Sequence, residues 1–250
     1  MRFIAIIPAR FASTRFPGKP LAEMNGKSMI QRVYEQVKRS IQDVYVATDD
    51  DRILEAVECF GGKAIMTSTS HRSGTDRCNE AYNKIGQTFD VVLNIQGDEP
   101  FIFPEQIDLL KACFTDDTVE IATLVKPFDQ KSELTALENP STPKVVLSQK
   151  SEAIYFSRSI IPFLRDVDRK DWCTKHVFYK HIGIYGYRTD ILNEITQLSP
   201  SILEQAESLE QLRWIENGYK IKVGITNHET IGIDTPHDLE NAIKQLELNK

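Results

Sequence analysis

Short apolar runs alternate with segments of helical periodicity along the first half of the chain. Residues 3–8 form a continuous apolar run that is typical of a buried parallel strand, and apolar side chains then recur at helical spacing from Met29 to Val37. The same alternation predicts strands at 44–47, 64–66 and 89–95, and helices at 51–60, at 75–85 and from Pro104 onward. Strands that alternate with helices predict an α/β fold with a mostly parallel central sheet covered by helices on both faces.

The pattern becomes less regular after a predicted strand at 121–125. Further strands are expected at 144–147, 153–156, 181–187 and 220–225, and helices at 208–215 and from Pro236. Residues 160–175 have the weakest pattern and are expected to form a long ordered loop that covers the site or packs on a partner. We therefore predict one domain over 1–250, with a smaller α+β extension over approximately 127–190.

Composition narrows the classes of function. The 250 residues are 41% hydrophobic and 26% charged, with a net charge of -6, which argues against a general nucleic-acid or membrane-surface binder. No apolar run approaches the roughly 18 to 20 residues that span a bilayer, and the first run lacks a signal-peptide pattern, so a cytoplasmic protein is expected. The four cysteines and five histidines lack metal-ligand spacing and are not expected to bind zinc, and the cysteines are expected to be reduced and mostly buried.

The loop after the first strand is a candidate phosphate site. It contains the cations Arg10, Arg15 and Lys19, with Ser13 and Thr14 as hydroxyl donors between them. Loops at the carboxyl ends of parallel strands commonly bind anions in α/β proteins, although solvated surface charges are the alternative. The sequence has no G-x-G-x-x-G, and its Gly-Lys-Ser at 26–28 lacks the first glycine of a Walker A loop. A phosphate site here must therefore use side-chain cations.

Two acids follow apolar stretches and are candidate metal ligands. Asp98 comes directly after the strand at 89–95, and a carboxylate that faces phosphates is tolerated when a divalent cation lies between them. Asp234 precedes the helix that begins at Pro236, and by itself this position favours a helix cap. Two acids opposite arginine and lysine are what a magnesium-assisted transfer at phosphorus requires.

A third polar cluster, at 71–77, follows a predicted strand. Ser73, Thr75 and the backbone around Gly74 are placed to contact the edge of a base. The alternative is a capped helix start with Thr75 as the cap, which leaves Arg72 and Arg77 unexplained.

Eight segments in order resemble the 3-deoxy-manno-octulosonate cytidylyltransferases, also called CMP-KDO synthetases. The segments are 7–21, 46–49, 73–77, 94–100, 155–158, 180–188, 209–213 and 232–236. The resemblance implies a GT-A-like nucleotidyltransferase fold and a magnesium-dependent transfer of CMP from CTP to the acid sugar KDO, with release of pyrophosphate. It also implies a cytoplasmic homodimer that serves lipopolysaccharide biosynthesis and uses the 127–190 extension for dimerisation and sugar binding.

The resemblance also implies roles for individual residues. Arg10 and Lys19 would act in catalysis together with Asp98 and Asp234, which would bind magnesium. The triphosphate would contact Arg10, Ser13, Arg15 and Lys19, and the cytidine would lie near Ser73, Gly74, Thr75 and Arg77. The sugar would contact Gln96, Arg158, His181, Tyr185, Glu210 and Gln211. Without the resemblance, Tyr185 would be interpreted as strand packing, His181 as a core histidine, and Glu210 and Gln211 as solvated helix residues.

Alternative functions remain open at this point. Many family members have Trp-Asp where this chain has Phe163-Leu164, so an 8-amino variant of KDO is an alternative acceptor. A further alternative is a cytidylyltransferase for another acidic sugar, such as an acylneuraminate. A regulatory nucleotide-binding protein without turnover would be expected to lack the two acids. A sugar-1-phosphate nucleotidylyltransferase would be expected to open with Ala-Gly-Gly where this chain has Pro8-Ala9-Arg10.

Overall fold

The computed structural model describes residues 1–12, 15–129, 134–229 and 232–248, with side chains up to residue 244. The chain forms two compact units. Unit 1 comprises Met1–Asp108, Gly186–Thr196 and Thr230–Lys250, and unit 2 comprises Leu109–Tyr185 and Gln197–Glu229. The single domain with an extension over 127–190 stays a prediction.

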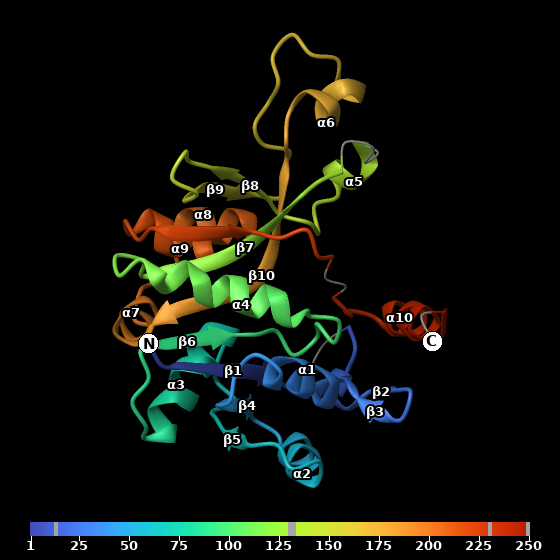
Figure 1. Ribbon diagram of the computed structural model, residues 1–250, viewed down its shortest axis with the longest axis vertical. Helices are drawn as coiled ribbons and strands as arrows, with labels where there is room; N and C mark the ends of the chain where they lie inside the picture. The colour runs from blue at the N-terminus through green and yellow to red at the C-terminus, as the bar shows by residue number, and fades with distance from the viewer. Residues whose placement is uncertain (13–14, 130–133, 230–231, 249–250) are drawn as a thin grey trace. The chain divides into compact units, whose positions relative to one another are not determined.

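Unit 1 is built on a parallel sheet in which β1 (Phe3–Ala9) is central (Figure 1). One edge of β1 pairs with β6 (Val91–Asn94) and the other with β4 (Val44–Thr48), which in turn pairs with β5 (Ala64–Met66). Ile4, Ala5, Ile6 and Ile7 have no exposed surface, which is why the strand is apolar at consecutive positions instead of alternating. The predicted mostly parallel sheet is confirmed.

The helices of unit 1 begin at polar caps. Ser28 caps α1 (Met29–Lys38), Asp50 caps α2 (Asp51–Cys59) and Ser73 caps α3 (Gly74–Ile85). The cap of α3 is therefore Ser73 and not Thr75, which is buried within the first turn. The side chain of Ser73 accepts a hydrogen bond from the amide of Asp76 and so satisfies one of the free N–H groups of that turn.

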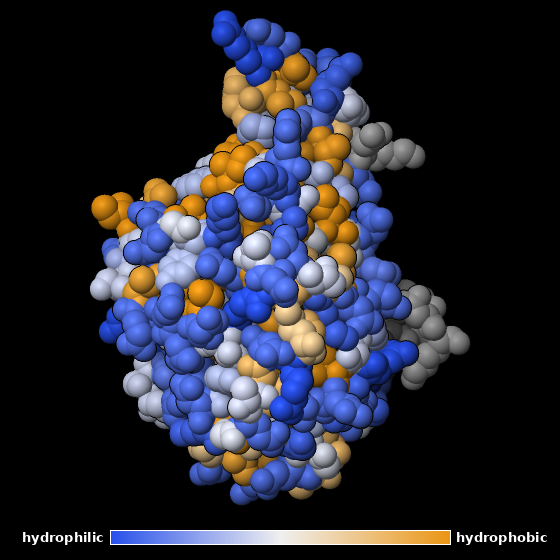
Figure 2. All heavy atoms as spheres, turned by 60° about the vertical axis from the view of Figure 1, so that its left-hand side comes forward, coloured by the Kyte–Doolittle hydropathy of each residue, from blue (hydrophilic) through white to orange (hydrophobic). Residues whose placement is uncertain are grey.

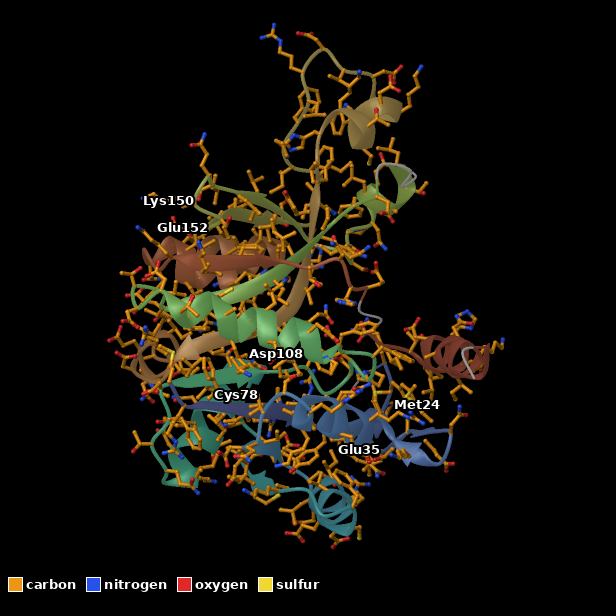
Figure 3. The ribbon with its side chains drawn as sticks, in the orientation of Figure 1. Met24, Glu35, Cys78, Asp108, Lys150 and Glu152 are labelled. Atoms are coloured by element: carbon orange, nitrogen blue, oxygen red, sulfur yellow. The ribbon has the colours of Figure 1, made fainter. Side chains whose placement is uncertain are left out.

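A small apolar cluster holds the C-terminal helix against the first hairpin of unit 1. Met24, Met29, Ile233 and Ala242 are buried together, and Met24 is labelled in Figure 3. This packing fixes the segment that leads into the C-terminal helix. The remaining elements of the unit are η1 (Lys19–Leu21), β2 (Glu23–Met24), β3 (Lys27–Ser28), α7 (Thr189–Ile195), α10 (Pro236–Leu248) and the first part of α4 (Pro104–Ala112).

Unit 2 mixes parallel and antiparallel strands, as its irregular sequence pattern predicts. β7 (Ile121–Pro127) pairs in parallel with β11 (Ile221–Ile225), whereas β8 (Lys144–Leu147) pairs in antiparallel fashion with β9 (Ala153–Ser157) and with β10 (Tyr179–Arg188). Lys150 and Glu152 mark the connection between β8 and β9 (Figure 3). The helices are η2 (Cys113–Thr115), α5 (Leu134–Glu138), η3 (Arg169–Asp171), α6 (Trp172–Lys175), α8 (Ile202–Glu207) and α9 (Gln211–Glu216).

The structure corrects the predicted helix at 208–215. Ser208 does not cap that helix: it ends α8 in the left-handed region with φ of 51°, and α9 begins only at Gln211. The difference arises because Ser201 and Glu204 form a capping box that starts a separate short helix, α8, just upstream. The short helices α5, α7 and α8 were not predicted because each presents fewer than three turns of periodic pattern.

The segment 160–175 is mostly irregular but ordered around Trp172. This side chain is buried against Leu137 and Phe178, and its indole N–H donates to the carbonyl of Val167 at 3.1 Å. Phe163 is 75% exposed, with its ring centroid 5.3 Å from that of Trp172. Its role, as a cover of the site or as a contact with a partner, stays a prediction.

The face drawn in Figure 2 is mostly hydrophilic, with hydrophobic patches between the polar residues. The four cysteines are free thiols; only Cys78 is buried and Cys59 is exposed, so the prediction of mostly buried thiols is wrong. Among the described residues, no helix is both long and apolar enough to cross a membrane.

We expect Ile6→Ala to lower the free energy of unfolding by about 3 kcal/mol, because the truncation leaves a cavity in the fully buried strand β1. Urea denaturation followed by circular dichroism measures the change. Ile202→Ala is the matched control, since Ile202 is 82% exposed and its truncation should alter the free energy by less than about 0.5 kcal/mol. Equal effects of the two substitutions would contradict the assignment of β1 as the centre of the core.

Candidate active site

A cavity of about 260 Å³ in unit 1 collects the charged side chains of four segments. It lies where β1 and β6 end, which is the edge of a parallel sheet at which ligands bind in α/β proteins. The lining comes from the end of β1 and its following loop, from the start of α3, from the segment after β6, and from the approach to α10. Its described charged and polar side chains are Arg10, Arg15, Lys19, His71, Arg72, Ser73, Arg77, Gln96, Asp98 and Asp234.

Two glycines allow the segments to approach closely. A Cβ at Gly97 would lie 2.9 Å from the carbonyl oxygen of Pro8, and one at Gly74 would lie 3.2 Å from Cγ of the same proline. A side chain at Gly97 would therefore push the segment after β6 away from β1. The absence of a side chain brings Gln96 and Asp98 beside the loop that carries the cations.

Lys19 lies between the two predicted metal ligands. Its Nζ is 2.6 Å from Oδ2 of Asp98 and 3.3 Å from Oδ1 of Asp234, and its side chain is only 13% exposed. Arg15 reaches the other oxygen of Asp234 at 3.1 Å. The amide of Ile233 donates to the carbonyl of Asp98 at 3.0 Å and so ties the two acidic segments together. Folding thus brings both acids to one ammonium group.

Asp234 does not act as the helix cap that its position suggested. The amide of Asp238 donates to Oγ1 of Thr235 at 3.2 Å, and Oδ2 of Asp238 accepts from the amides of Thr235 at 2.8 Å and Asp234 at 3.1 Å. These reciprocal bonds satisfy the first turn of α10. The carboxylate of Asp234 is therefore available to face Lys19 and Arg15.

The described residues suit a magnesium ion whose remaining ligands are phosphate oxygens of a substrate. No group of three His, Cys, Asp or Glu side chains that would hold a metal occurs in the part of the chain that the structure describes. Magnesium, however, is often held by one or two carboxylates together with phosphate oxygens and water. Asp98 and Asp234 already share a cationic partner, which shows that a positive charge is accommodated between them.

The other predicted phosphate residues lie on the same loop. Arg10 is exposed and lines the cavity. Arg15 also lines it and is exposed, with 65% of its side chain accessible. Ser13 and Thr14 lie outside the described residues.

The residues predicted near cytidine differ in how much of them reaches the cavity. Ser73, Gly74 and Arg77 line it, whereas Thr75 is buried with its hydroxyl 3.5 Å from that of Tyr187. Arg77 is only 3% exposed, and its guanidinium donates to Oγ1 of Thr67 at 2.6 Å and to Asp49 at 2.7 Å. A contact between cytidine and any of these residues stays a prediction.

The sequence-based site list lacks three residues that the structure places at or beside the cavity. His71 and Arg72 line it, and both belong to the polar segment that had already been singled out. Glu99 is buried next to Asp98, and burial together with the charge of Asp98 raises the pKa of Glu99 to about 8. The acid pair at 98–99 was the available signal, but only the fold shows which of the two faces the cavity.

Most of the predicted sugar residues lie in unit 2, and two of them pack together. The ring centroids of His181 and Tyr185 are 5.3 Å apart, and Nε2 of His181 is 3.0 Å from the hydroxyl of Thr123. Burial lowers the pKa of His181 to about 3, so its imidazole is neutral. Burial, assisted by the charge of Glu210, raises the pKa of Tyr185. These side chains therefore offer neutral donors and acceptors.

The other residues of unit 2 that are predicted to contact the sugar are Arg158, Glu210 and Gln211. Arg158 donates through its guanidinium to the carbonyls of Glu207, Pro140 and Ser208 at 2.6, 2.8 and 3.1 Å. Gln211 is only 5% exposed, so it is not a solvated helix residue, and its Nε2 has no hydrogen-bond partner among the described residues. A buried amide without a partner is costly and suits a position that a polar ligand completes. Glu210 is partly buried, and Gln96 lines the cavity of unit 1.

Known proteins are similar to the chain over almost its whole length. A family model described as cytidylyltransferase matches residues 4–221. A relative from Parabacteroides distasonis, named 3-deoxy-manno-octulosonate cytidylyltransferase, is 66% identical over 97% of both chains, and one of the same name from Bacteroides thetaiotaomicron is 64% identical over 97% of both. A solved structure of CMP:2-keto-3-deoxy-manno-octonic acid synthetase complexed with CTP superposes with a TM-score of 0.91, at 42% identity over 100% of both chains.

The neutral His181 predicts how stability depends on pH. Its pKa is about 3 in the folded chain and about 6.5 when unfolded, so the unfolded chain gains a proton below pH 6.5 that the folded chain does not. Acidification therefore favours unfolding, and the contribution present above pH 6.5 is lost as the pH falls. We expect the free energy of unfolding to fall by about 2 kcal/mol more in the wild type than in His181→Gln when the pH is lowered from 7 to 5. Urea denaturation of both proteins at the two pH values measures the difference. Equal losses would show that His181 is protonated in the folded chain.

Proposed function

The chain belongs to the 3-deoxy-manno-octulosonate cytidylyltransferase family, and from this we propose that it transfers CMP from CTP to the anomeric hydroxyl of 3-deoxy-D-manno-octulosonate (KDO), releasing pyrophosphate. The observation that carries the proposal is the contact of Lys19 with both Asp98 and Asp234, in a cavity whose lining also includes four arginines. The relatives' names and the CTP complex of the structural neighbour support the same reaction.

The chemistry is a displacement at the α-phosphorus of CTP. The anomeric oxygen of the sugar forms a bond to phosphorus, the bond from phosphorus to the bridging oxygen breaks, and the electron pair leaves with pyrophosphate. Arg10, Arg15 and Lys19 bind the phosphates and stabilise the negative charge that accumulates on the leaving group. Their placement on one loop orients the triphosphate for attack.

We propose that the enzyme is magnesium-dependent and that Asp98 and Asp234 hold the ion. Two carboxylates in a cavity that also receives a triphosphate match the ligands that magnesium prefers. When bound, magnesium neutralises the phosphates and makes the sugar hydroxyl more acidic. With the ion between the two acids, Lys19 would be available to contact phosphate.

We propose that the sugar contacts Gln96, Arg158, His181, Tyr185, Glu210 and Gln211. A polyhydroxylated carboxylate needs a cation and several neutral hydrogen-bonding groups. Arg158 supplies the cation, and three backbone carbonyls hold its guanidinium in one orientation. The neutral imidazole of His181 and the buried amide of Gln211 suit hydroxyl groups.

The acceptor is tested by measuring pyrophosphate release with CTP, magnesium and a panel of sugar acids. We expect release with KDO and at least tenfold less with N-acetylneuraminate, while the 8-amino analogue of KDO tests the Phe163-Leu164 departure. Release with the amino sugar alone would transfer the assignment to that acceptor. Binding of CTP without release for any acceptor would indicate a regulatory protein.

We further propose a cytoplasmic homodimer that supplies lipopolysaccharide biosynthesis and uses residues near 127–190 for dimerisation. The support is the family resemblance of the sequence over its whole length. Light scattering should give twice the 28.5 kDa of one chain. A mass of one chain at micromolar concentration would contradict the dimer and leave the reaction unaffected.

Replacing Asp98 with Asn should reduce turnover by about 100-fold or more while leaving the fold intact. The neutral amide is a weak ligand for magnesium and does not compensate the positive charge of Lys19. Pyrophosphate release measured against magnesium concentration should also show a higher requirement for the ion. Asp51→Asn is the control, since Asp51 is an exposed carboxylate on the first turn of α2. Near-normal turnover of Asp98→Asn would exclude Asp98 as a metal ligand.

A further inference from the structure

One face of α3 holds the segment that forms part of the cavity wall. Arg77, Glu80 and Lys84 are spaced three and four residues apart and therefore lie on the same side of the helix. Each of them contacts the segment 66–71, which precedes the cavity-lining residues Arg72, Ser73 and Gly74. We call these three residues the tether face.

The contacts are distributed along the segment. Arg77 donates to Oγ1 of Thr67 at 2.6 Å, and Lys84 donates to the carbonyl of Met66 at 2.9 Å. Glu80 lies between them: it accepts from the amide of Ser68 at 2.9 Å and contacts Nε2 of His71. Lys84 also forms an ion pair with Glu80 at 2.6 Å. The segment is thereby held at Met66, Thr67, Ser68 and His71.

Glu80 is the centre of this network and is anionic at neutral pH. Burial by itself would raise its pKa, but hydrogen bonds from Lys84, the Ser68 amide and His71 lower the pKa of Glu80 to about 2. An anionic acceptor makes stronger hydrogen bonds than a neutral one. His71 is thus held against a fixed negative charge, with 19% of its side chain exposed and the residue lining the cavity.

We propose that Glu80 is a positioning residue for CTP, which acts by fixing His71 and the loop at 66–74 as a preformed wall of the cavity. The inference rests on the proposed use of CTP. A loop that must be ordered by its ligand loses conformational entropy on binding, whereas a loop that is already tethered does not. Glu80 itself does not line the cavity, so its contribution to affinity passes through the residues that it holds.

The first test compares Glu80→Ala with Glu35→Ala by calorimetric titration of the full chain with CTP and magnesium. Glu35 is a matched control: it lies on α1, outside the cavity, and its carboxylate accepts from Lys27 at 2.6 Å and Gln31 at 2.9 Å (Figure 3). We expect Glu80→Ala to weaken CTP binding about tenfold and Glu35→Ala to change it less than twofold. Glu80→Gln, which keeps an acceptor oxygen, should recover part of the affinity and serves if the alanine variant does not fold.

A second test separates positioning from general stabilisation. If Glu80 acts through His71, then Glu80→Ala should have a smaller effect on the CTP dissociation constant in a His71→Ala background than in the wild type. Equal effects of Glu80→Ala and Glu35→Ala, or full additivity with His71→Ala, would overturn the proposal. Because the readout is CTP binding, the acceptor sugar does not influence it. A wild type that fails to bind CTP would instead contradict the proposed function and this inference together.

Discussion

Two carboxylates and one ammonium group lie at the centre of the candidate active site. Two unit charges of the same sign 4 Å apart near a protein surface repel by about 4 kcal/mol, so neighbouring carboxylates are stabilised by a cation between them. Lys19 supplies that cation, with Nζ within 3.3 Å of both acids. The arrangement also suits the proposed ligands: Asp98 and Asp234 would hold a magnesium ion, and Lys19 would then be available to contact phosphate.

The convergence of the acids depends on packing that is remote from the chemistry. Asp234 reaches the cavity because Ile233 and Ala242 are buried against Met24 and Met29, and because Ile233 donates a backbone hydrogen bond to Asp98. Neighbouring residues satisfy the hydrogen bonds of the first turn of α10. Thr235 and Asp238 cap α10, which leaves the carboxylate of Asp234 for the site. At the start of α10, Asp238 therefore caps the helix, whereas Asp234 faces the cavity.

The residues of unit 2 that are predicted to contact the sugar include buried neutral polar groups. His181 is neutral because the interior disfavours its imidazolium form, and Gln211 is almost fully buried in a helix that begins at its own position. Arg158 carries a charge, but backbone carbonyls surround its guanidinium. Such groups can select a ligand by the direction of their hydrogen bonds, which is the kind of contact that the proposed binding of an acid sugar would use.

The sequence by itself determined the parallel sheet of unit 1 and the identity of the family. A strand buried on both faces must be apolar at successive positions, and β1 is recognisable for that local reason. The loop cations and Asp98 were also predictable, because the residues that follow a buried parallel strand lie at the edge of the sheet where ligands bind. The family followed from motifs spread along the whole chain.

Only the tertiary structure decided which side chains cap, which are buried and which face the cavity. Ser73 rather than Thr75 caps α3, and the guanidinium of Arg77 is held by Thr67 and Asp49. The pairing of Asp234 with Lys19 joins opposite ends of the chain. Local patterns predict elements, because backbone geometry repeats along the chain. They do not report contacts between distant segments, and those contacts set burial, charge compensation and the direction in which each side chain points.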